Sequence, residues 1–576
     1  MPTLHSQLFL QRVKPFVWLF GALATMFAVP TFAQDLESIS HQKPLGLDGA
    51  ITFSGTDYQA NGIPYRREPF SWTISGSPTL SFYGVQMPFS FILSEQERSF
   101  RQPFDQFGAS PQYKWMTLHL GYRSMMFSHY TLAGVTFLGA GFEATPGVIR
   151  LSGMYGRLQR PVEEDTTNPS VQPSYQRMGY AAKLGFGSDQ NHFDFIFFHA
   201  KDDSLSLTHP ITLSQVYPQE NSVLGVSSQF TIFDPLTFTM DAGASALTRD
   251  LRASSIDSNK LPSFLPSLIN VKSSTSVSIA GESALTLKLS HFAARLQYQR
   301  IEPDYTSLGA YYFNTDIENY TIAPDFDVFD GKVHVSGSIG LQHDNILKNK
   351  LAQTSRLIGS GSISWNPSQA FGLDANYTNY STDQAGGLKP INDSIRVRNV
   401  SQSASFAPRY MIIGNDANEV FSLVSSLQQY TDLNSYTNQL SNSKSATAAL
   451  SYTKAFTKET KSIGGSLLFA LTQTSQVTTR IFGGSVNGSI GMMDNKLTLA
   501  GSIGYTEDLL SANDTLTKLA SSAGTINENI NFTWQVGTED NVSLTIYATE
   551  NTSSQFQPTP YQEFTATMSY TRSFSF

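Results

Sequence analysis

The sequence of 576 residues contains no cysteine, so disulfides cannot hold its fold. Charged residues are also scarce at 15%, against about 25% in an average soluble domain. After residue 33, no apolar run reaches the roughly 18 residues that indicate a transmembrane helix. The net charge of −8 argues against nucleic acid as a partner. These absences exclude a disulfide scaffold, a helical membrane protein and a basic nucleic-acid-binding protein.

Aromatic residues, in contrast, are abundant and reach 12% of the chain, with 40 Phe and 25 Tyr. Low charge, many aromatics and no helical span are what a transmembrane β-barrel needs. Its apolar surface is spread over every second residue of each strand, so no single apolar run is required. The composition therefore favours an all-β fold in a membrane.

The first 33 residues have the three parts of a secretory signal peptide. Arg12 and Lys14 supply positive charge before an apolar run from Phe16 to Val29, and Thr31-Phe32-Ala33 provides small residues for cleavage. This run is too short to span a bilayer, which requires about 20 residues. No cysteine follows it, which excludes a lipoprotein. We therefore expect export and cleavage after Ala33.

Alternation of apolar and polar residues with a period of two is the strongest pattern in the rest of the chain. It is clear in residues 332–342, 496–506 and 542–549, where Val, Leu and Ile alternate with Ser and Thr. So many segments share this pattern that a soluble two-layer core could not bury them all. We expect a short periplasmic segment at 34–49 and a single antiparallel transmembrane barrel at 50–576.

Connections between the predicted strands alternate in length. Short ones such as 144–147 and 329–332 are followed by long polar ones such as 160–175 and 250–273. Short periplasmic turns that alternate with long external loops are typical of bacterial outer-membrane barrels. Counting back from a descending last strand predicts about 26 strands, with about 24 as the alternative. This count requires a hairpin at Gly121-Tyr122-Arg123.

The lumen of such a barrel presents a problem, because barrels of about 16–18 strands already enclose an aqueous channel. Only residues 34–49 precede the first predicted strand, so we expect no plug domain of the kind found in TonB-dependent receptors. The lumen must then be reduced by a partner protein, by inward-folded loops or by a flattened cross-section.

The last strand, 564–576, ends in Phe576 with aromatic residues two and six positions before it, Phe574 and Tyr570. This ending resembles the C-terminal signal that delivers outer-membrane proteins to the barrel-assembly machinery. Barrel closure requires the last strand to pair with the first, because an unpaired edge would leave backbone polar groups in hydrocarbon. We therefore expect 564–576 to pair antiparallel with a strand near 50–58.

Several stretches in the first 330 residues resemble a mostly uncharacterised family of outer-membrane β-barrels common in the Bacteroidota. The stretches are NGIPYRR at 61–67, QPFDQFG at 102–108, YKW at 113–115, LAGVTFLGAG at 132–141, MYGR at 154–157, AKDD at 200–203 and RIEPDYTSLGAYYFNTDIENYTIAP at 300–324. The resemblance implies the location and the barrel. It implies no established activity and transfers no catalytic residue.

An acidic and aromatic group at the mouth of one predicted hairpin is a candidate ligand-contact loop, because carboxylates beside aromatic rings suit a sugar or a calcium ion. Its members are Glu302, Asp304, Tyr305, Tyr311, Tyr312 and Asp316. Asp325, Asp327 and Asp330 resemble a calcium loop, but no Glu occupies the last EF-hand position. A polar hairpin turn is the better interpretation there, and we expect no metal and no cofactor.

His192, Asp194 and His199 are the residues that an outer-membrane hydrolase could use. Asp194 shares a strand face with His192, whereas His199 has the opposite parity, and no Ser nucleophile motif accompanies them. Polar residues at a strand rim are the better interpretation, so we expect no enzyme.

The sequence therefore favours an outer-membrane barrel that is a passive conduit or the barrel component of a transport or secretion assembly. A surface-binding, adhesin-like barrel that acts through its long external loops is the alternative, and a hydrolase is a weaker one. The expected partners are outer-membrane lipid and the barrel-assembly machinery. A lumen-filling or periplasmic partner protein would be a further one.

Overall fold

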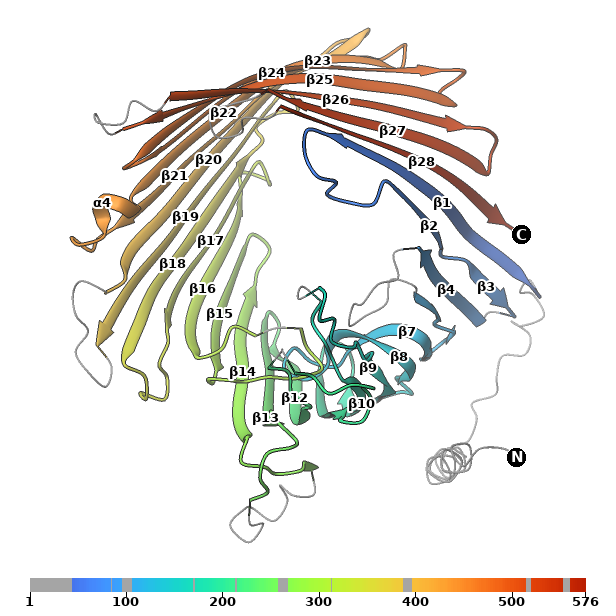
Figure 1. The fold of residues 1–576 in the computed structure, drawn as a ribbon, viewed down its shortest axis with the longest axis vertical. Helices are drawn as coiled ribbons and strands as arrows, with labels where there is room; N and C mark the ends of the chain where they lie inside the picture. The colour runs from blue at the N-terminus through green and yellow to red at the C-terminus, as the bar shows by residue number, and fades with distance from the viewer. Residues whose placement is uncertain are drawn as a thin grey trace.

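Most of the described chain is β-strand, arranged as one closed ring (Figure 1). The computed structural model describes residues 44–576 except 84, 96–105, 169–170, 213–214, 257–267, 312, 387–395, 514–519 and 553–559. The expected signal peptide and most of segment 34–49 lie outside the described residues. No helix in the described part of the chain is long and apolar enough to span a membrane.

The first half of the ring is built from fifteen strands. They are β1 (Gly46–Asn61), β2 (Phe70–Gly76), β3 (Thr79–Phe82), β4 (Val85–Ser94), β5 (Gln106–Ala109), β6 (Gln112–Tyr113), β7 (Met116–Met126), β8 (Ala133–Ala144), β9 (Ile149–Gln159), β10 (Gln176–Gly187), β11 (His192–Asp203), β12 (Glu220–Phe233), β13 (Leu236–Thr248), β14 (Thr275–Lys288) and β15 (Phe292–Ile301).

The second half contains thirteen strands and a single turn of helix. They are β16 (Ile317–Val328), β17 (Val333–His343), β18 (Ala352–Trp365), β19 (Phe371–Gly386), β20 (Arg398–Ile413), β21 (Ala417–Asp432), α4 (Asn438–Ser441), β22 (Ser443–Phe456), β23 (Lys461–Thr474), β24 (Val477–Met492), β25 (Leu497–Ala512), β26 (Ala520–Gln535), β27 (Asp540–Asn551) and β28 (Tyr561–Ser575).

The 28 strand segments occupy 26 antiparallel positions around the barrel, and we name each such position a stave. Both β2 and β3 lie between β1 and β4, so they are one stave interrupted at Ser77-Pro78, where proline has no N–H for the ladder. Both β5 and β6 likewise lie between β4 and β7. The predicted count is therefore confirmed, and no separate plug domain is seen among the described residues.

Closure of the ring is made by the first and last strands, as expected. β1 and β28 pair antiparallel from Asp48 opposite Ser575 to Asn61 opposite Gln562. Side-chain hydroxyls reinforce this seam on one face of the sheet. The pairs are Thr52–Thr571 at 2.9 Å, Ser54–Ser569 at 2.7 Å and Thr56–Thr567 at 3.1 Å.

The hairpin predicted at Gly121-Tyr122-Arg123 is wrong, because β7 runs through these residues without turning. The missing stave is instead formed by β5 and β6, so the predicted total is correct although the predicted hairpin is not. Gly121 has a φ of +85°, and a Cβ there would lie 2.5 Å from the Phe107 carbonyl oxygen. The glycine therefore marks a close approach of two backbones.

The two ends of the barrel differ in their connections. At the end where β1 begins and β28 ends, which we name the turn end, connections such as 145–148 and 329–332 are short. At the opposite end, the loop end, they include 160–175, 204–219 and 249–274. The predicted alternation in length is therefore present at most positions; the two-residue connection 475–476 between β23 and β24 is a short one at the loop end.

Most strands present one apolar and one mostly polar face, and cross-strand pairing joins the apolar faces around the wall. Exposed residues such as Leu341, Leu467 and Val486 belong to this apolar face, and Leu467 is 65% exposed. The hydroxyl ladder of the seam lies on the other face. The apolar face is the outside of the barrel, and the polar face lines the lumen.

Candidate functional site

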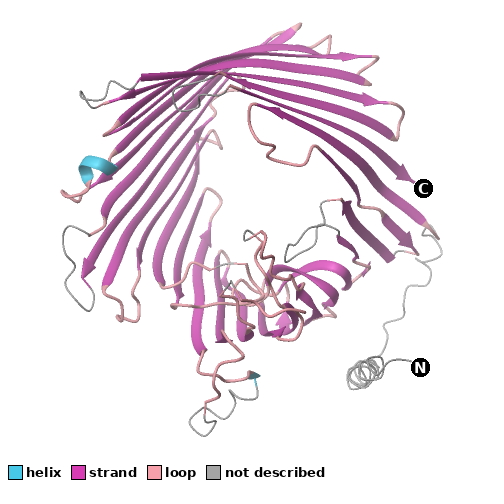
Figure 2. Ribbon diagram, in the orientation of Figure 1, coloured by secondary structure: helices cyan, strands magenta, loops and turns pink. Residues whose placement is uncertain are grey.

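Two loop-end connections fold back against the inner face of the barrel. We name residues 127–132 together with residues 302–316 the lumen insert; position 312 lies outside the described residues. Figure 2 shows loop segments gathered over β8–β12 on the side of the ring centre. Tyr130, Thr131 and Leu132 are fully buried, as is Tyr305 at 1% exposure. Inward-folded loops, one of the three expected solutions to the lumen problem, therefore occupy part of the lumen.

An apolar patch on the inner face of β8–β12 holds the lumen insert. Phe137, Ile196, Phe198 and Val223 are buried there and form one cluster with residues of the insert. Leu132 belongs to this cluster, and Leu308 packs against it. Burial of such side chains contributes roughly 1.5–3 kcal/mol each. Hydrophobic contact therefore holds the insert on this side of the wall.

Hydrogen bonds tie the two parts of the insert to each other. The Tyr305 hydroxyl donates to the backbone carbonyl of Tyr130 at 2.5 Å, and the Ser307 hydroxyl donates to the carbonyl of Thr131 at 2.5 Å. Burial raises the pKa of both Tyr130 and Tyr305, so both phenols keep their protons. The insert thus behaves as one packed body.

Further hydrogen bonds fix the insert to the wall. The Asn221 amide oxygen accepts the Leu308 N–H at 3.0 Å, while its amide nitrogen donates to the Ser245 hydroxyl at 2.8 Å. Ser245 in turn donates to the Thr306 carbonyl at 2.6 Å. Asn221 and Ser245, which lie on the neighbouring strands β12 and β13, therefore bind the backbone of the insert.

Three aromatic rings complete the contact. Tyr130 stacks on Phe313 with ring centroids 6.0 Å apart, and Tyr305 meets both rings edge-on at 6.1 and 5.1 Å. Gly243 of β13 lies directly beneath them. A Cβ there would clash with the Tyr305 hydroxyl and lie 3.1 Å from the Tyr130 Cβ. The wall needs glycine at this point for the rings to fit.

The opposite wall, from β18 through β28 to β1, has a different inner face. It carries neutral hydroxyl and amide side chains that bond across strand pairs and remain partly or fully exposed. The hydroxyl pairs are Thr378–Ser403 at 2.6 Å, Ser422–Ser451 at 2.6 Å, Ser426–Thr447 at 2.7 Å, Ser462–Ser489 at 2.7 Å and Ser466–Ser485 at 2.7 Å. The lumen therefore has an occupied apolar side and a water-accessible polar side.

The predicted ligand-contact residues fall within or beside the lumen insert, and the structure does not gather them. Glu302 accepts the Ile279 N–H at 2.9 Å, and Tyr305 is buried. Asp304 is 67% exposed and pairs with Arg249 at 3.3 Å. Tyr311 is 72% exposed, and Tyr312 lies outside the described residues. A role in ligand contact stays a prediction.

Asp316, the last member of this group, is buried at the end of the insert. Its carboxylate accepts the N–H groups of Asn345 and Ile346, both at 3.0 Å, and pairs with Lys350 at 2.5 Å. Burial alone would raise the pKa of Asp316, but these partners together hold it below its usual value. This carboxylate anchors the neighbouring loop 344–351.

The candidate hydrolase residues are not assembled as a charge-relay system. Arg150 holds Asp194 at 3.0 Å, so this carboxylate serves an ion pair. His199 instead lies 2.8 Å from the Ser222 hydroxyl and 3.7 Å from Glu220, two residues that the sequence pattern missed. Ser222 is buried and donates its proton to the Leu268 carbonyl at 2.6 Å. A catalytic serine would instead donate its hydroxyl proton to the imidazole, so this arrangement does not make Ser222 a nucleophile.

The residues of the predicted assembly signal lie at the seam. The Tyr570 hydroxyl donates to Asp540 at 2.6 Å, and Phe574 stacks on Phe576 with centroids 6.3 Å apart. The Phe576 N–H donates to the Leu47 carbonyl at 3.0 Å. The terminal residue is thus joined to the first strand by its backbone, and its ring is exposed.

Neither a protein-family model nor a curated protein sequence matches the chain. Among solved structures, the P pilus usher (PapC) translocation pore is similar at 10% identity, covering 92% of this chain and 99% of that one, with a TM-score of 0.34. OccK2 (OpdF) of Pseudomonas aeruginosa has 10% identity, covering 92% and 98%, with a TM-score of 0.28. OccAB2 of Acinetobacter baumannii has 10% identity, covering 69% and 98%, also at 0.28. At these values the likeness carries no argument about function.

Proposed function

We propose that this chain is an outer-membrane β-barrel that serves as a passive conduit for polar solutes or as the barrel component of a transport or secretion assembly. One observation carries the proposal. The chain fills one side of its own lumen with a packed insert and leaves the other side lined mainly by neutral, water-accessible hydroxyls and amides. A polar wall beside a fixed insert favours a narrowed aqueous path.

Three features support the outer membrane as the location. The outer face of the wall exposes large apolar side chains, which suits lipid. The N-terminal segment has the pattern of a secretory signal, and the last strand ends in the aromatic pattern centred on Phe574 and Phe576. Membership of the Bacteroidota barrel family stays a prediction that rests on the sequence stretches alone.

The lining indicates the kind of solute that would pass. Selectivity in a pore follows from its width and from the donors and acceptors that line it. Hydroxyl pairs such as Ser422–Ser451 and Ser466–Ser485 offer both donors and acceptors without a net charge. We therefore infer a preference for small neutral hydroxylated solutes over strongly charged ones.

Proteoliposome swelling with purified protein tests this proposal. We expect neutral sugars to enter faster than charged compounds of the same size, and empty liposomes to stay tight. A protein that stays tight to every solute, and that extracts in mild detergent without any associated protein, would contradict both versions of the proposal.

A surface-binding barrel remains the second candidate, and one observation favours it. Two long loops are ordered against each other at the loop end, where Glu163 accepts the Thr208 N–H at 2.6 Å and Glu164 accepts the Thr212 N–H at 2.7 Å. Preordered loops lose less conformational entropy on binding. A double variant, Glu163→Ala with Glu164→Ala, should weaken binding to cell surfaces and leave solute entry unchanged. Unchanged binding would remove this candidate.

A further inference from the structure

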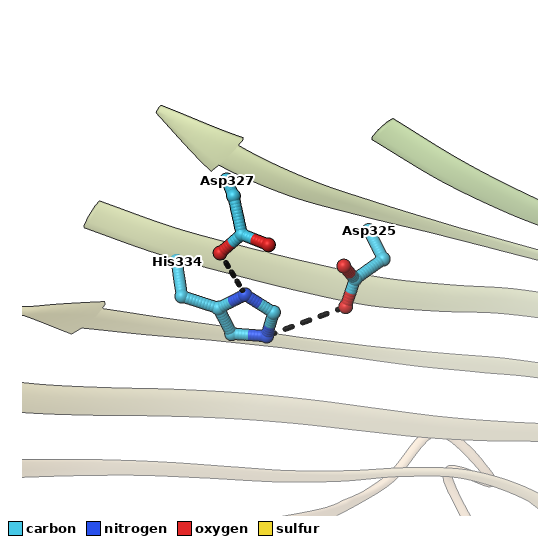
Figure 3. Close-up of side chains that lie close together, drawn as sticks. All are labelled: Asp325, Asp327 and His334. Atoms are coloured by element: carbon cyan, nitrogen blue, oxygen red, sulfur yellow. Dashed lines mark hydrogen bonds and ion pairs between the residues drawn. The ribbon is translucent and has the colours of Figure 1, made fainter. Parts of the chain in front are cut away.

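Three potential metal-ligating side chains converge near the turn end of the barrel, where β16 turns into β17. Asp325 and Asp327 are two residues apart on β16 and therefore share a face, and the strand register places Asp327 opposite His334 of β17. Figure 3 shows the imidazole of His334 lying between the two carboxylates. His334 Nδ1 is 2.9 Å from Asp327 Oδ1, and Nε2 is 3.3 Å from Asp325 Oδ2.

This cluster lies on the lumen face and is open to water. Asp325 is opposite Ser336, and Ser336 bonds to Ser362 on the polar inner face of the wall. Each of the three side chains is roughly half-exposed. Ions that enter the barrel can therefore reach the cluster. The cluster lies apart from the lumen insert, which belongs to the loop end.

The two imidazole nitrogens have different partners, and this difference determines the chemistry. An Nδ1–H that donates to Asp327 fixes the ring orientation and the tautomer, so that Nε2 faces Asp325. A carboxylate behind a histidine in this way is the usual support of a metal-binding imidazole. The Nε2 proton that bridges to Asp325 is the one that a metal ion would replace.

The spacing fits a first-row metal ion. Two ligands that each lie about 2.1 Å from a tetrahedral zinc ion are separated by roughly 3.4 Å, and Nε2 and Asp325 Oδ2 are 3.3 Å apart. An imidazole ligand favours zinc, copper or nickel over calcium or magnesium, which prefer oxygen donors only. Asp330, which completes the calcium-like pattern in the sequence, does not belong to this group of three.

We propose that His334 and Asp325 bind a divalent transition-metal ion of the zinc class in the lumen. His334 supplies Nε2 and Asp325 supplies a carboxylate oxygen, while Asp327 is a positioning residue that orients the imidazole. Water or a passing solute would complete the coordination sphere. The site ties β16 to β17 and does not depend on whether the barrel conducts.

Isothermal titration of ZnCl₂ into the full-length, detergent-solubilised barrel tests the site. The wild type should bind one Zn²⁺. His334→Ala and Asp325→Asn should abolish binding, and Asp327→Asn should weaken it by about 10–100-fold, the usual effect of losing a partner that orients a ligand. His343→Ala is the matched control. His343 pairs with Glu318 at 2.9 Å at the opposite ends of the same two strands, and its loss should leave zinc binding unchanged.

The proposal is overturned if the wild type takes up no Zn²⁺, or if His334→Ala binds it as tightly as the wild type does. Loss of binding in His343→Ala alone would also overturn it, because the ion would then occupy the other end of the hairpin. Heat-modifiable migration verifies that each variant is assembled. If His334→Ala fails to assemble, the isosteric Asp325→Asn decides the question, and retained binding there contradicts the site.

Discussion

The Tyr305 hydroxyl donates a hydrogen bond to the Tyr130 carbonyl oxygen at 2.5 Å, although 175 positions separate the two residues in the chain. Both residues belong to loop-end connections, and both side chains are buried. A bond between them joins two loops into a single body inside the barrel. The stability of the lumen insert, and with it the width of the aqueous path, should therefore depend on this contact.

Tyr305→Phe should loosen the lumen insert without disturbing the barrel. The ring keeps its packing against Phe313, but the Tyr130 carbonyl loses its partner in a buried position. Such a loss costs about 1–3 kcal/mol. Amide hydrogen exchange of residues 302–311 should become faster, while heat-modifiable migration stays normal. Unchanged exchange would show that this bond does not hold the insert.

Gly243→Val should push the insert away from β13, because the new side chain would occupy the space of the Tyr305 hydroxyl. We expect larger single-channel steps and easier proteolysis within 302–316. The matched control is Gly359→Val, since Gly359 faces open space on the outer side of β18 and its substitution should change neither property. If the two variants give equal single-channel steps and equal proteolysis, the contact between Gly243 and the insert is contradicted.

The anchor at Asp316 should respond to acid. The pKa of this carboxylate is lowered in the folded state from its ordinary value of 3.8, so its stabilising contribution is complete above that value. It is lost as the pH falls further, through the folded pKa. Proteolysis of loop 344–351 by an acid protease should therefore accelerate below about pH 4.

Asp316→Asn should make loop 344–351 labile even at neutral pH and remove the acid response. The control is Asp416→Asn, because Asp416 forms an exposed ion pair with Lys458 at the turn end and should contribute little. An acid response that survives in Asp316→Asn would assign it to another group.

Deletion of Phe576 should impair assembly far more than deletion of Leu205, a residue of a loop-end connection that is 90% exposed. The first deletion removes the terminal aromatic of the predicted signal and the backbone bond to Leu47. The readout is the fraction of heat-modifiable protein in isolated membranes. Equal fractions for the two deletions would refute the assembly role of the C-terminus.

The barrel could be predicted from the sequence because strand orientation is a local property. The alternation at 332–342 and 496–506 fixes which residues face outward, whatever the rest of the chain does. The length of the connections then fixed the count of 26 staves. The hairpin prediction failed at Gly121. In the sequence, a glycine that permits the close approach of two backbones looks the same as a glycine in a turn.

The contents of the lumen could not be predicted in the same way. Tyr130 is buried against Tyr305, and their two loops meet only through the pairing of the strands between them, β8 to β15. His199 meets Ser222, and Asp327 meets His334, through the register between neighbouring strands. A single-residue shift in either register would separate these pairs. Sites of this kind require the three-dimensional structure.

Single-channel conductance in planar bilayers tests the central claim most directly. The wild type should be compared with a variant in which residues 306–310 are replaced by an equally long Gly-Ser segment, which removes Leu308 from the apolar patch. A self-narrowed conduit predicts discrete conductance steps for the wild type and larger steps for the variant. A wild type that does not conduct, with a variant that is equally tight, would contradict the account.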